Sequence, residues 1–221
     1  MVKAVLFDMD GVLFETERMY YDRLVVLMRE YGHEMTRAFF VSTLGVPISA
    51  CRALYYQSYG NDFPYDEVYH RLFDDVGDYV KQFGTPLKPG VSACFAALQA
   101  RGLKMVLATS APRSAANDFF AMLPELDQIL SGKVCGDEVE HGKPDPEIFR
   151  KAAHLAGFAP DQCLGVEDSP SGLKAIRACG AYAVMIPDLL PYTDALQPYV
   201  DTVLESLAEL PALIDQINKQ P

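Results

Sequence analysis

The sequence has few positive charges, no closely spaced cysteine pair and no long apolar run. Its 221 residues include 19 lysines and arginines against 30 aspartates and glutamates, a formal net charge of -11. This negative charge disfavours nucleic acid and anionic membrane surfaces as partners. The first residues show no signal-peptide pattern, so we expect none, and no apolar run has the length of a membrane span. We therefore expect a soluble cytoplasmic protein.

The cysteines are odd in number and widely spaced, and no repeat or low-complexity segment accompanies them. This pattern predicts a reduced chain with mostly buried thiols, and it disfavours a zinc site. Half of the residues are apolar, enough for the core of one α/β domain with or without a small insertion. The five cysteines are Cys51, Cys94, Cys135, Cys163 and Cys179.

Strand-like and helix-like segments alternate from residue 89 onward, after a buried apolar strand over residues 2–7. This alternation predicts an α/β fold, a Rossmann-like parallel sheet covered by helices on both faces. Sites in such sheets form beyond the carboxyl ends of the strands. The expected strands are 104–108, 128–131, 163–166 and 182–186, and the expected helices are 91–101, 115–122, 146–156, 171–179 and 204–217.

The segment from residue 16 to residue 84 differs from the rest of the chain. It holds nine of the twelve tyrosines, and its apolar residues recur at helical spacing. We expect about four helices, no strand, and aromatics that mostly pack in a core. The sequence thus predicts a core domain from residues 1–14 and 85–221, and an inserted all-α domain over residues 15–84.

Two aspartates, Asp8 and Asp10, follow the first strand and precede Gly11. Carboxylates are costly to desolvate, so a pair at the end of a core strand suggests a paired or metal-bound site. Alternate residues of an extended chain point the same way, so both could serve one site. The alternative is a solvated turn, where Asp and Gly are common.

Polar residues follow two further segments of the predicted core. Thr109 and Ser110 end the strand 104–108, where hydroxyls and turn amides could bind phosphate oxygens or merely cap a helix. Lys143 precedes Pro144, which restricts its backbone to extended conformations. A lysine held in this way can act as a point charge toward a phosphoryl group, although surface lysines are more usual.

A second acidic pair, Glu167 and Asp168, ends the strand 163–166. Two groups of carboxylates on neighbouring strand ends would repel one another unless a cation lay between them. Magnesium prefers oxygen ligands and needs few carboxylates, so Asp8, Asp168 and Glu167 would suit it. The alternative for Glu167 and Asp168 is a charged helix start stabilised by the helix dipole.

Four motifs in this order resemble those of the haloacid dehalogenase-like (HAD) hydrolase superfamily. The resemblance covers nearly the whole chain, and the joint match is specific although each motif alone is modest. The helical insertion resembles the C1 cap of the phosphoglycolate phosphatase and β-phosphoglucomutase branch, closest to its sugar-phosphate and pseudouridine-5'-phosphate phosphatases. The motifs are Asp8-Met9-Asp10-Gly11, Leu107-Ala108-Thr109-Ser110, Gly142-Lys143-Pro144-Asp145 and Glu167-Asp168-Ser169.

The resemblance implies a magnesium-dependent phosphatase that forms an aspartyl-phosphate on Asp8 while Asp10 acts as acid and base. It implies Thr109, Ser110 and Lys143 as phosphate-binding residues. The implied partner is a small phosphorylated metabolite, a sugar phosphate or nucleotide monophosphate, and we expect a monomer or weak dimer. The metal ligands it implies are Asp8, Asp168, the backbone carbonyl of Asp10 and, as a fourth, Glu167.

A mutase of the β-phosphoglucomutase type is the main alternative. That branch usually carries a histidine early in the first cap helix and an arginine in a cap loop. Residues 16–21 contain no histidine, and the loop after Gly45 contains no arginine before Arg52. A phosphonatase would need a cap lysine for a Schiff base, and only Lys81 is present. A non-catalytic binding protein on the same fold is disfavoured because the motif residues are retained.

Overall fold

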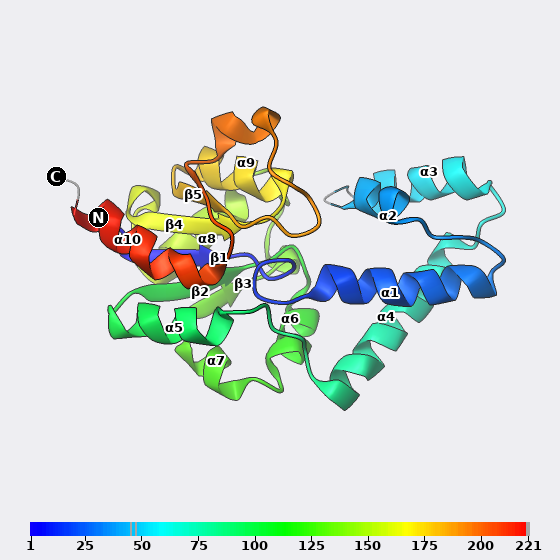
Figure 1. Ribbon diagram of the computed structural model, residues 1–221, viewed down its shortest axis with the longest axis horizontal. Coiled ribbons are helices and arrows are strands. Elements are labelled where there is room, and N and C mark those ends of the chain that lie inside the picture. The colour runs from blue at the N-terminus through cyan, green and yellow to red at the C-terminus, as the bar shows by residue number, and fades with distance from the viewer. Residues whose placement is uncertain (45, 47, 220–221) are drawn as a thin grey trace. The chain divides into compact units, whose positions relative to one another are not determined.

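The computed structural model describes residues 1–44, 46 and 48–219 of the chain. The chain divides into two compact units (Figure 1). The first unit combines Met1–Glu15 with Thr85–Pro221, and the second is the continuous segment Thr16–Gly84. No helix among the described residues is both long enough and apolar enough to cross a bilayer.

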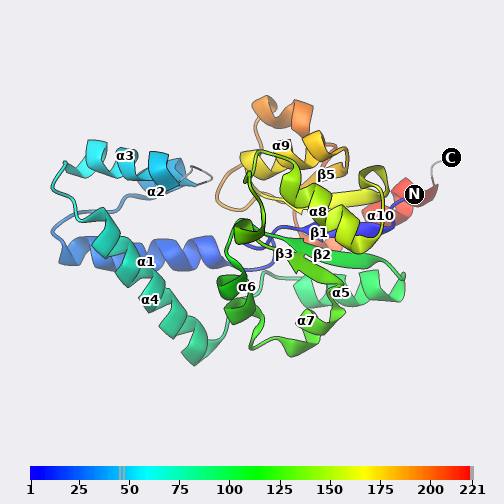
Figure 2. The same ribbon diagram turned by 180° about the vertical axis from the view of Figure 1, so that it is seen from behind.

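The first unit is built on a parallel sheet whose described strands follow the order β3-β2-β1-β4-β5-β6 (Figures 1 and 2). The strand order changes direction beside β1, because β2 pairs with one of its edges and β4 with the other. Such a switch point leaves a crevice at the carboxyl ends of the strands. The strands are β1 (Ala4–Phe7), β2 (Lys104–Ala108), β3 (Gly132–Val134), β4 (Cys163–Glu167), β5 (Tyr182–Met185) and β6 (Thr202–Val203).

Helices cover both faces of this sheet, as the α/β alternation requires (Figure 2). On one face, α8 (Glu147–Ala156) packs on β2 and α9 (Pro170–Cys179) packs on β5. The opposite face carries α5 (Val91–Ala100) and α10 (Leu210–Lys219) (Figure 1). Two further helices, α6 (Arg113–Phe120) and α7 (Pro124–Ile129), connect β2 to β3 along the chain. Each residue of β1 is buried, which explains its uninterrupted apolar sequence.

The second unit consists of α1 (Thr16–Glu30), α2 (Arg37–Thr43), α3 (Ile48–Tyr59) and α4 (Tyr65–Phe83), with no strand among its described residues. Its core centres on Tyr55, which is fully buried. The Tyr55 ring packs against aromatic rings from α2, α3, α4 and the α3–α4 connection. These rings belong to Phe39, Tyr59, Phe63, Tyr65 and Tyr69.

The strand predicted at 128–131 is wrong. The first half of that segment belongs to α7, which ends at Ile129. This helix begins at Pro124 and carries Glu125 and Asp127 in its first turn, all favourable at a helix N-terminus. The strand beside β2 is instead Gly132–Val134, whose glycine and lysine hide the apolar pattern.

The predicted helix 204–217 also begins too early. Thr202–Val203 forms the edge strand β6, and Leu207–Glu209 forms a single 3₁₀ turn before α10 starts at Leu210. Pro211, at the second position of α10, suits a helix start there. The strand 104–108 matches β2. The predicted helix 115–122 is shifted by two residues from α6, and the remaining predicted elements of the core differ from those observed by one or two residues at one end.

Candidate active site

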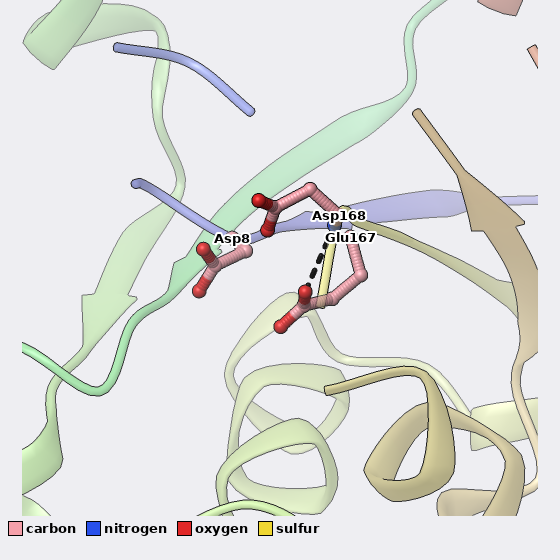
Figure 3. Close-up of side chains that lie close together, drawn as sticks. All are labelled: Asp8, Glu167 and Asp168. Atoms are coloured by element: carbon pink, nitrogen blue, oxygen red, sulfur yellow. Dashed lines mark hydrogen bonds between the residues drawn. The ribbon is translucent and has the colours of Figure 1, made fainter. Parts of the chain in front are cut away.

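Three carboxylates gather where β1 and β4 end (Figure 3). Asp8 directly follows β1, Glu167 is the last residue of β4, and Asp168 comes next. The Asp8 N–H donates to the Val166 carbonyl over 3.0 Å, which continues the β1–β4 pairing and holds Asp8 beside the acidic pair. Carboxylate oxygens of the three residues lie within 4.8 Å of one another, and all three residues are buried.

This arrangement makes ionisation of Asp8 unfavourable. Burial is the largest cause that raises the pKa of Asp8; with the charges of Glu167 and Asp10, and against the opposing charge of Lys143, it brings the pKa to about 7. The cluster is therefore a place where a cation would lower the free energy of the ionised carboxylates. Three closely spaced carboxylates supply the hard oxygen ligands that Mg²⁺ prefers, so the donor set fits a divalent ion of that type.

Lys143 supplies the positive charge in this site. Its ammonium donates to the Asp8 carboxylate, to Glu167 Oε1 over 2.8 Å and to the Ala108 carbonyl over 3.0 Å. The side chain is only 4 % exposed. Burial by itself would lower the pKa of Lys143, but Asp8 and Glu167 outweigh it and raise the pKa above its ordinary value. Lys143 therefore remains charged and fixed among acceptors at the ends of β1, β2 and β4.

Glu167 is held from two sides. Its Oε1 accepts from Lys143, whereas Oε2 accepts from the Asp168 N–H, the Ser169 N–H and the Ser169 hydroxyl, over 2.8–2.9 Å. The Ser169 hydroxyl in turn accepts from the Gly172 N–H and caps α9. Glu167 thus anchors Lys143 to the start of α9, in addition to being a candidate metal ligand.

Two glycines make room for these carboxylates. A Cβ at Gly11 would lie 2.3 Å from Asp168 Oδ2, and the φ of Gly11 is +74°, a conformation that side-chain-bearing residues rarely adopt. At Gly172 a Cβ would lie only 1.6 Å from Glu167 Oε1. The close approach of backbone to carboxylate therefore requires glycine at both positions.

Asp10 lies outside the group of three carboxylates. The strand ends at Phe7, and Asp10 belongs to a turn in which it pairs with Phe14, so the alternation expected of an extended chain does not extend to it. Its charge still acts on Asp8, whose pKa it helps to raise. The structure therefore brings Asp8, Glu167 and Asp168 together and keeps Asp10, which is half-buried, at their border.

Thr109 and Ser110 follow β2 and differ in their surroundings. Thr109 is fully buried; its N–H donates to Val134 and its hydroxyl accepts from the Ala111 N–H over 3.0 Å. The hydroxyl thus closes a turn rather than capping α6, which starts at Arg113 with Pro112 at its N-cap. Ser110 is exposed. Thr109 stands one residue beyond Ala108, whose carbonyl binds Lys143.

A partly buried ion pair between Lys88 and Asp188 was not predicted from the sequence. Asp188 follows β5 closely, and one of its carboxylate oxygens lies within 4.8 Å of one of Asp168. The available signal was a third acidic residue shortly after a core strand, at the same edge of the sheet.

Comparisons with known proteins agree on one family. The family model described as haloacid dehalogenase-like hydrolase matches residues 2–180. Among curated proteins, the phosphorylated carbohydrates phosphatase of Thermotoga maritima is 29% identical over 81% of this chain and 82% of its own length. The hexitol phosphatase B of Escherichia coli K12 is 27% identical over 96% and 95%, respectively. The crystal structure of a β-phosphoglucomutase from Clostridium difficile superposes with a TM-score of 0.74, at 20% identity over 99% of this chain and 98% of that one, a likeness of fold.

Proposed function

This chain belongs to the haloacid dehalogenase-like hydrolases and is a phosphoric monoester hydrolase, and we propose that it is a magnesium-dependent phosphatase that works through an aspartyl-phosphate. The observation that carries the proposal is Lys143 held between Asp8 and Glu167 beside a buried group of carboxylates. A phosphoryl dianion and an aspartate repel one another, so a site for this reaction must concentrate positive charge at that point.

In the proposed first step, a carboxylate oxygen of Asp8 forms a bond to phosphorus as the bond to the leaving oxygen breaks. Asp10 donates a proton to the leaving alkoxide. In the second step, Asp10 takes a proton from the water that attacks phosphorus, which releases phosphate and restores the Asp8 carboxylate. Thr109, Lys143 and the Ser110 N–H would hold the phosphoryl oxygens throughout, and they would thereby align phosphorus with Asp8.

The residues that would hold Mg²⁺ are Asp8, Asp168 and the backbone carbonyl of Asp10, with Glu167 as a fourth ligand. When bound, the ion would offset the negative charge of the phosphate and of Asp8. Glu167 already has protein donors on both oxygens, which supports a ligand set centred on Asp8 and Asp168.

The substrate in this proposal is a small phosphomonoester, a sugar phosphate or a nucleotide monophosphate. The names of the two relatives, a carbohydrate-phosphate phosphatase and a hexitol phosphatase, support the sugar phosphate. The helical unit Thr16–Gly84 is proposed as the cap that selects the leaving group and excludes water during the first step. We expect a cytoplasmic monomer or weak dimer that needs neither nucleic acid nor a membrane.

The mutase alternative is an outcome of the test rather than a second proposal. An arginine in the loop that begins at Gly45 would favour the mutase. Gly45 and Pro47 of this loop lie outside the described residues. Arg52, which follows that loop, forms an ion pair with Asp66.

The test is release of inorganic phosphate from p-nitrophenyl phosphate and from a panel of sugar phosphates and nucleotide monophosphates. We expect release that requires Mg²⁺, stops in EDTA and is most efficient with one class of natural ester. Conversion of glucose 1-phosphate to glucose 6-phosphate without phosphate release would favour the mutase. Absence of both reactions in the presence of Mg²⁺ would refute the proposed function.

A further inference from the structure

The loop that carries Lys143 is closed by a side chain outside the motif residues, the carboxylate of Glu147. Glu147 is the first residue of α8. Its two oxygens accept from the Glu140 N–H over 3.1 Å, and Oε2 also accepts from the His141 N–H over 2.9 Å. The carboxylate therefore joins the beginning of the loop to its end and closes residues 140–147 into a ring.

Further bonds stiffen this ring. The Glu147 N–H donates to Asp145 Oδ1 over 2.9 Å, and the Asp145 N–H donates to the Gly142 carbonyl over 3.0 Å. On the outer side, Lys151 forms an ion pair with Glu147 Oε1 at 2.6 Å. These bonds tie residues 140–142 to Asp145 and Glu147, and Lys143 lies between the bonded positions.

The charge of Glu147 is secure at the pH values of interest. The bond from Lys151, followed by those from the His141 and Glu140 N–H groups, lowers the pKa of Glu147 to about 2. Hydrogen bonds to an ionised acceptor are roughly twice as strong as neutral ones. The ring is therefore held by bonds that persist at neutral pH.

Lys143 needs such a ring because its own side chain is flexible. A lysine side chain has several rotatable bonds and loses rotamer entropy when it is fixed. Its ammonium reaches three acceptors on three strand ends only if the backbone that carries it stays in place. The three acceptors hold the ammonium of Lys143, and the ring of residues 140–147 holds its backbone.

We propose that Glu147 is a positioning residue for the phosphoryl-binding Lys143, acting by holding the loop 140–147 closed. The inference rests on the proposed function, because it assigns Lys143 to the transferring phosphoryl group. The partners of the Glu147 carboxylate are the Glu140 and His141 N–H groups and Lys151, and none of them is a proposed site residue. Glu147 acts on catalysis by fixing the position of the Lys143 ammonium. Mutation of a group that orients a functional side chain typically lowers activity by about 10- to 100-fold.

The experiment is a double-mutant cycle of Glu147→Ala and Lys143→Ala in the full-length protein. We expect Glu147→Ala to lower kcat/KM by about 10- to 100-fold and to weaken inhibition by orthovanadate by a similar factor. In the Lys143→Ala background the same change should have an effect of less than about 2-fold, because the residue through which it acts is gone. Glu147→Gln keeps one acceptor for the loop and should restore part of the loss.

Glu209 provides a matched control elsewhere in the chain. Its Oε1 accepts from the Glu205 and Ser206 N–H groups over 2.9 and 3.0 Å, just before α10, on a segment with no proposed site residue. Glu209→Ala should lower the Tm, as loss of a capping carboxylate does, and leave kcat/KM within about 2-fold. Lys151→Met removes the outer ion pair and the bond from Lys151 to the Glu138 carbonyl but keeps the bonds from the Glu140 and His141 N–H groups, so it should change vanadate inhibition much less than Glu147→Ala does.

Two results would overturn the inference in an active protein. One is a Glu147→Ala variant that is less stable but has wild-type kcat/KM and wild-type vanadate inhibition. The other is a loss that adds in full to that of Lys143→Ala, which would mean that Glu147 acts independently of Lys143. Failure of the proposed function would look different, because the wild-type protein itself would then release no phosphate with Mg²⁺.

Discussion

At the scale of single residues, the environment of Asp8 explains both its proposed reactivity and why its charge lowers the stability of the folded protein. Asp8 is buried at a strand end, next to two other carboxylates, and the ammonium of Lys143 counters their charge. A buried carboxylate with few water contacts is a better nucleophile toward phosphorus than a solvated one, provided that positive charge is close by.

Asp8→Asn removes the proposed nucleophile and leaves a side chain of nearly the same shape. We expect turnover of every phosphomonoester to fall by at least about 10³-fold, because an amide cannot form the acyl phosphate. Phosphate release under saturating Mg²⁺ measures the loss, and circular dichroism verifies that the fold persists. A folded variant with normal turnover would show that another group attacks phosphorus.

The raised pKa of Asp8 makes the stability of the metal-free protein depend on pH. Its pKa rises from 3.8 to about 7 on folding, so the folded state binds more protons between these values. Protonated Asp8 therefore contributes to the free energy of unfolding in full below pH 3.8, and this contribution is lost as the pH rises through about 7. In EDTA, the Tm of Asp8→Asn minus that of the wild type should therefore increase as the pH rises from about 5 to about 8. A Tm difference that stays constant over this range would contradict the burial of the charge.

Asp10→Asn should separate the acid role from the nucleophile. An alkyl phosphate needs its leaving oxygen protonated, so we expect a loss of about 10²- to 10⁴-fold with a sugar phosphate. With p-nitrophenyl phosphate, whose leaving group departs as a stable phenolate, the loss should be much smaller. The ratio of kcat/KM for the two substrates is the measurement, and equal losses would argue against an acid role.

At the scale of elements, the start of α9 organises the site. Its N-cap Ser169 holds Glu167 and Gly172 at once, so the geometry of the helix start and that of the Lys143 anchor are linked. The helix N-terminus also favours the negative charge of Glu167. The side chain of Glu167 therefore lies over the first turn of the helix, where a Cβ on the third residue would displace it.

Gly172→Ala should be harmful even though alanine is the better helix former by roughly 1 kcal/mol. The added Cβ must push Glu167 Oε1 away, which loosens Lys143, so we expect kcat/KM to fall by about 10- to 100-fold and the Tm to fall as well.

Gly77→Ala in α4 is the matched control, since a Cβ there meets nothing within 4 Å. It should raise stability by up to roughly 1 kcal/mol and leave activity unchanged. Equal behaviour of the two variants would mean that space beside Glu167 is not limiting.

At the scale of the whole molecule, burial keeps all reactive sulfur inside. The five cysteines, all among the described residues, are free and buried, which confirms the expectation of buried thiols. Burial also raises the pKa of Cys94 to about 12 and that of Cys163 to about 11, so these thiols stay protonated at neutral pH.

Thiol titration tests this burial. At about pH 8 a disulfide reagent such as DTNB should react with the native protein far more slowly than with the denatured one, because only an exposed thiolate attacks it. In the denatured protein five thiols should react, each of which releases one equivalent of the coloured thiolate from DTNB. Rapid reaction of a thiol in the native protein would show that one of the buried positions opens to solvent.

Much of this protein follows from local sequence alone. The apolar runs of β1, β2 and β4 determine buried strands, because a strand covered on both faces tolerates little else. The residues Asp8, Thr109, Lys143, Glu167 and Asp168 could be selected because each follows or ends such a segment or lies in a rigid turn. Strand and helix alternation then predicts that these ends meet at one edge of a parallel sheet.

The tertiary structure decided what depends on residues distant in sequence. It separates Asp10 from the three grouped carboxylates, joins Lys143 to Asp8 and Glu167, and pairs Lys88 with Asp188. It also makes a strand of Gly132–Val134, because pairing with β2 outweighs a weak local preference. Hydrogen bonds and charge pairs act across space, whereas a sequence pattern reports only on neighbours along the chain, and this is the physical reason for the division.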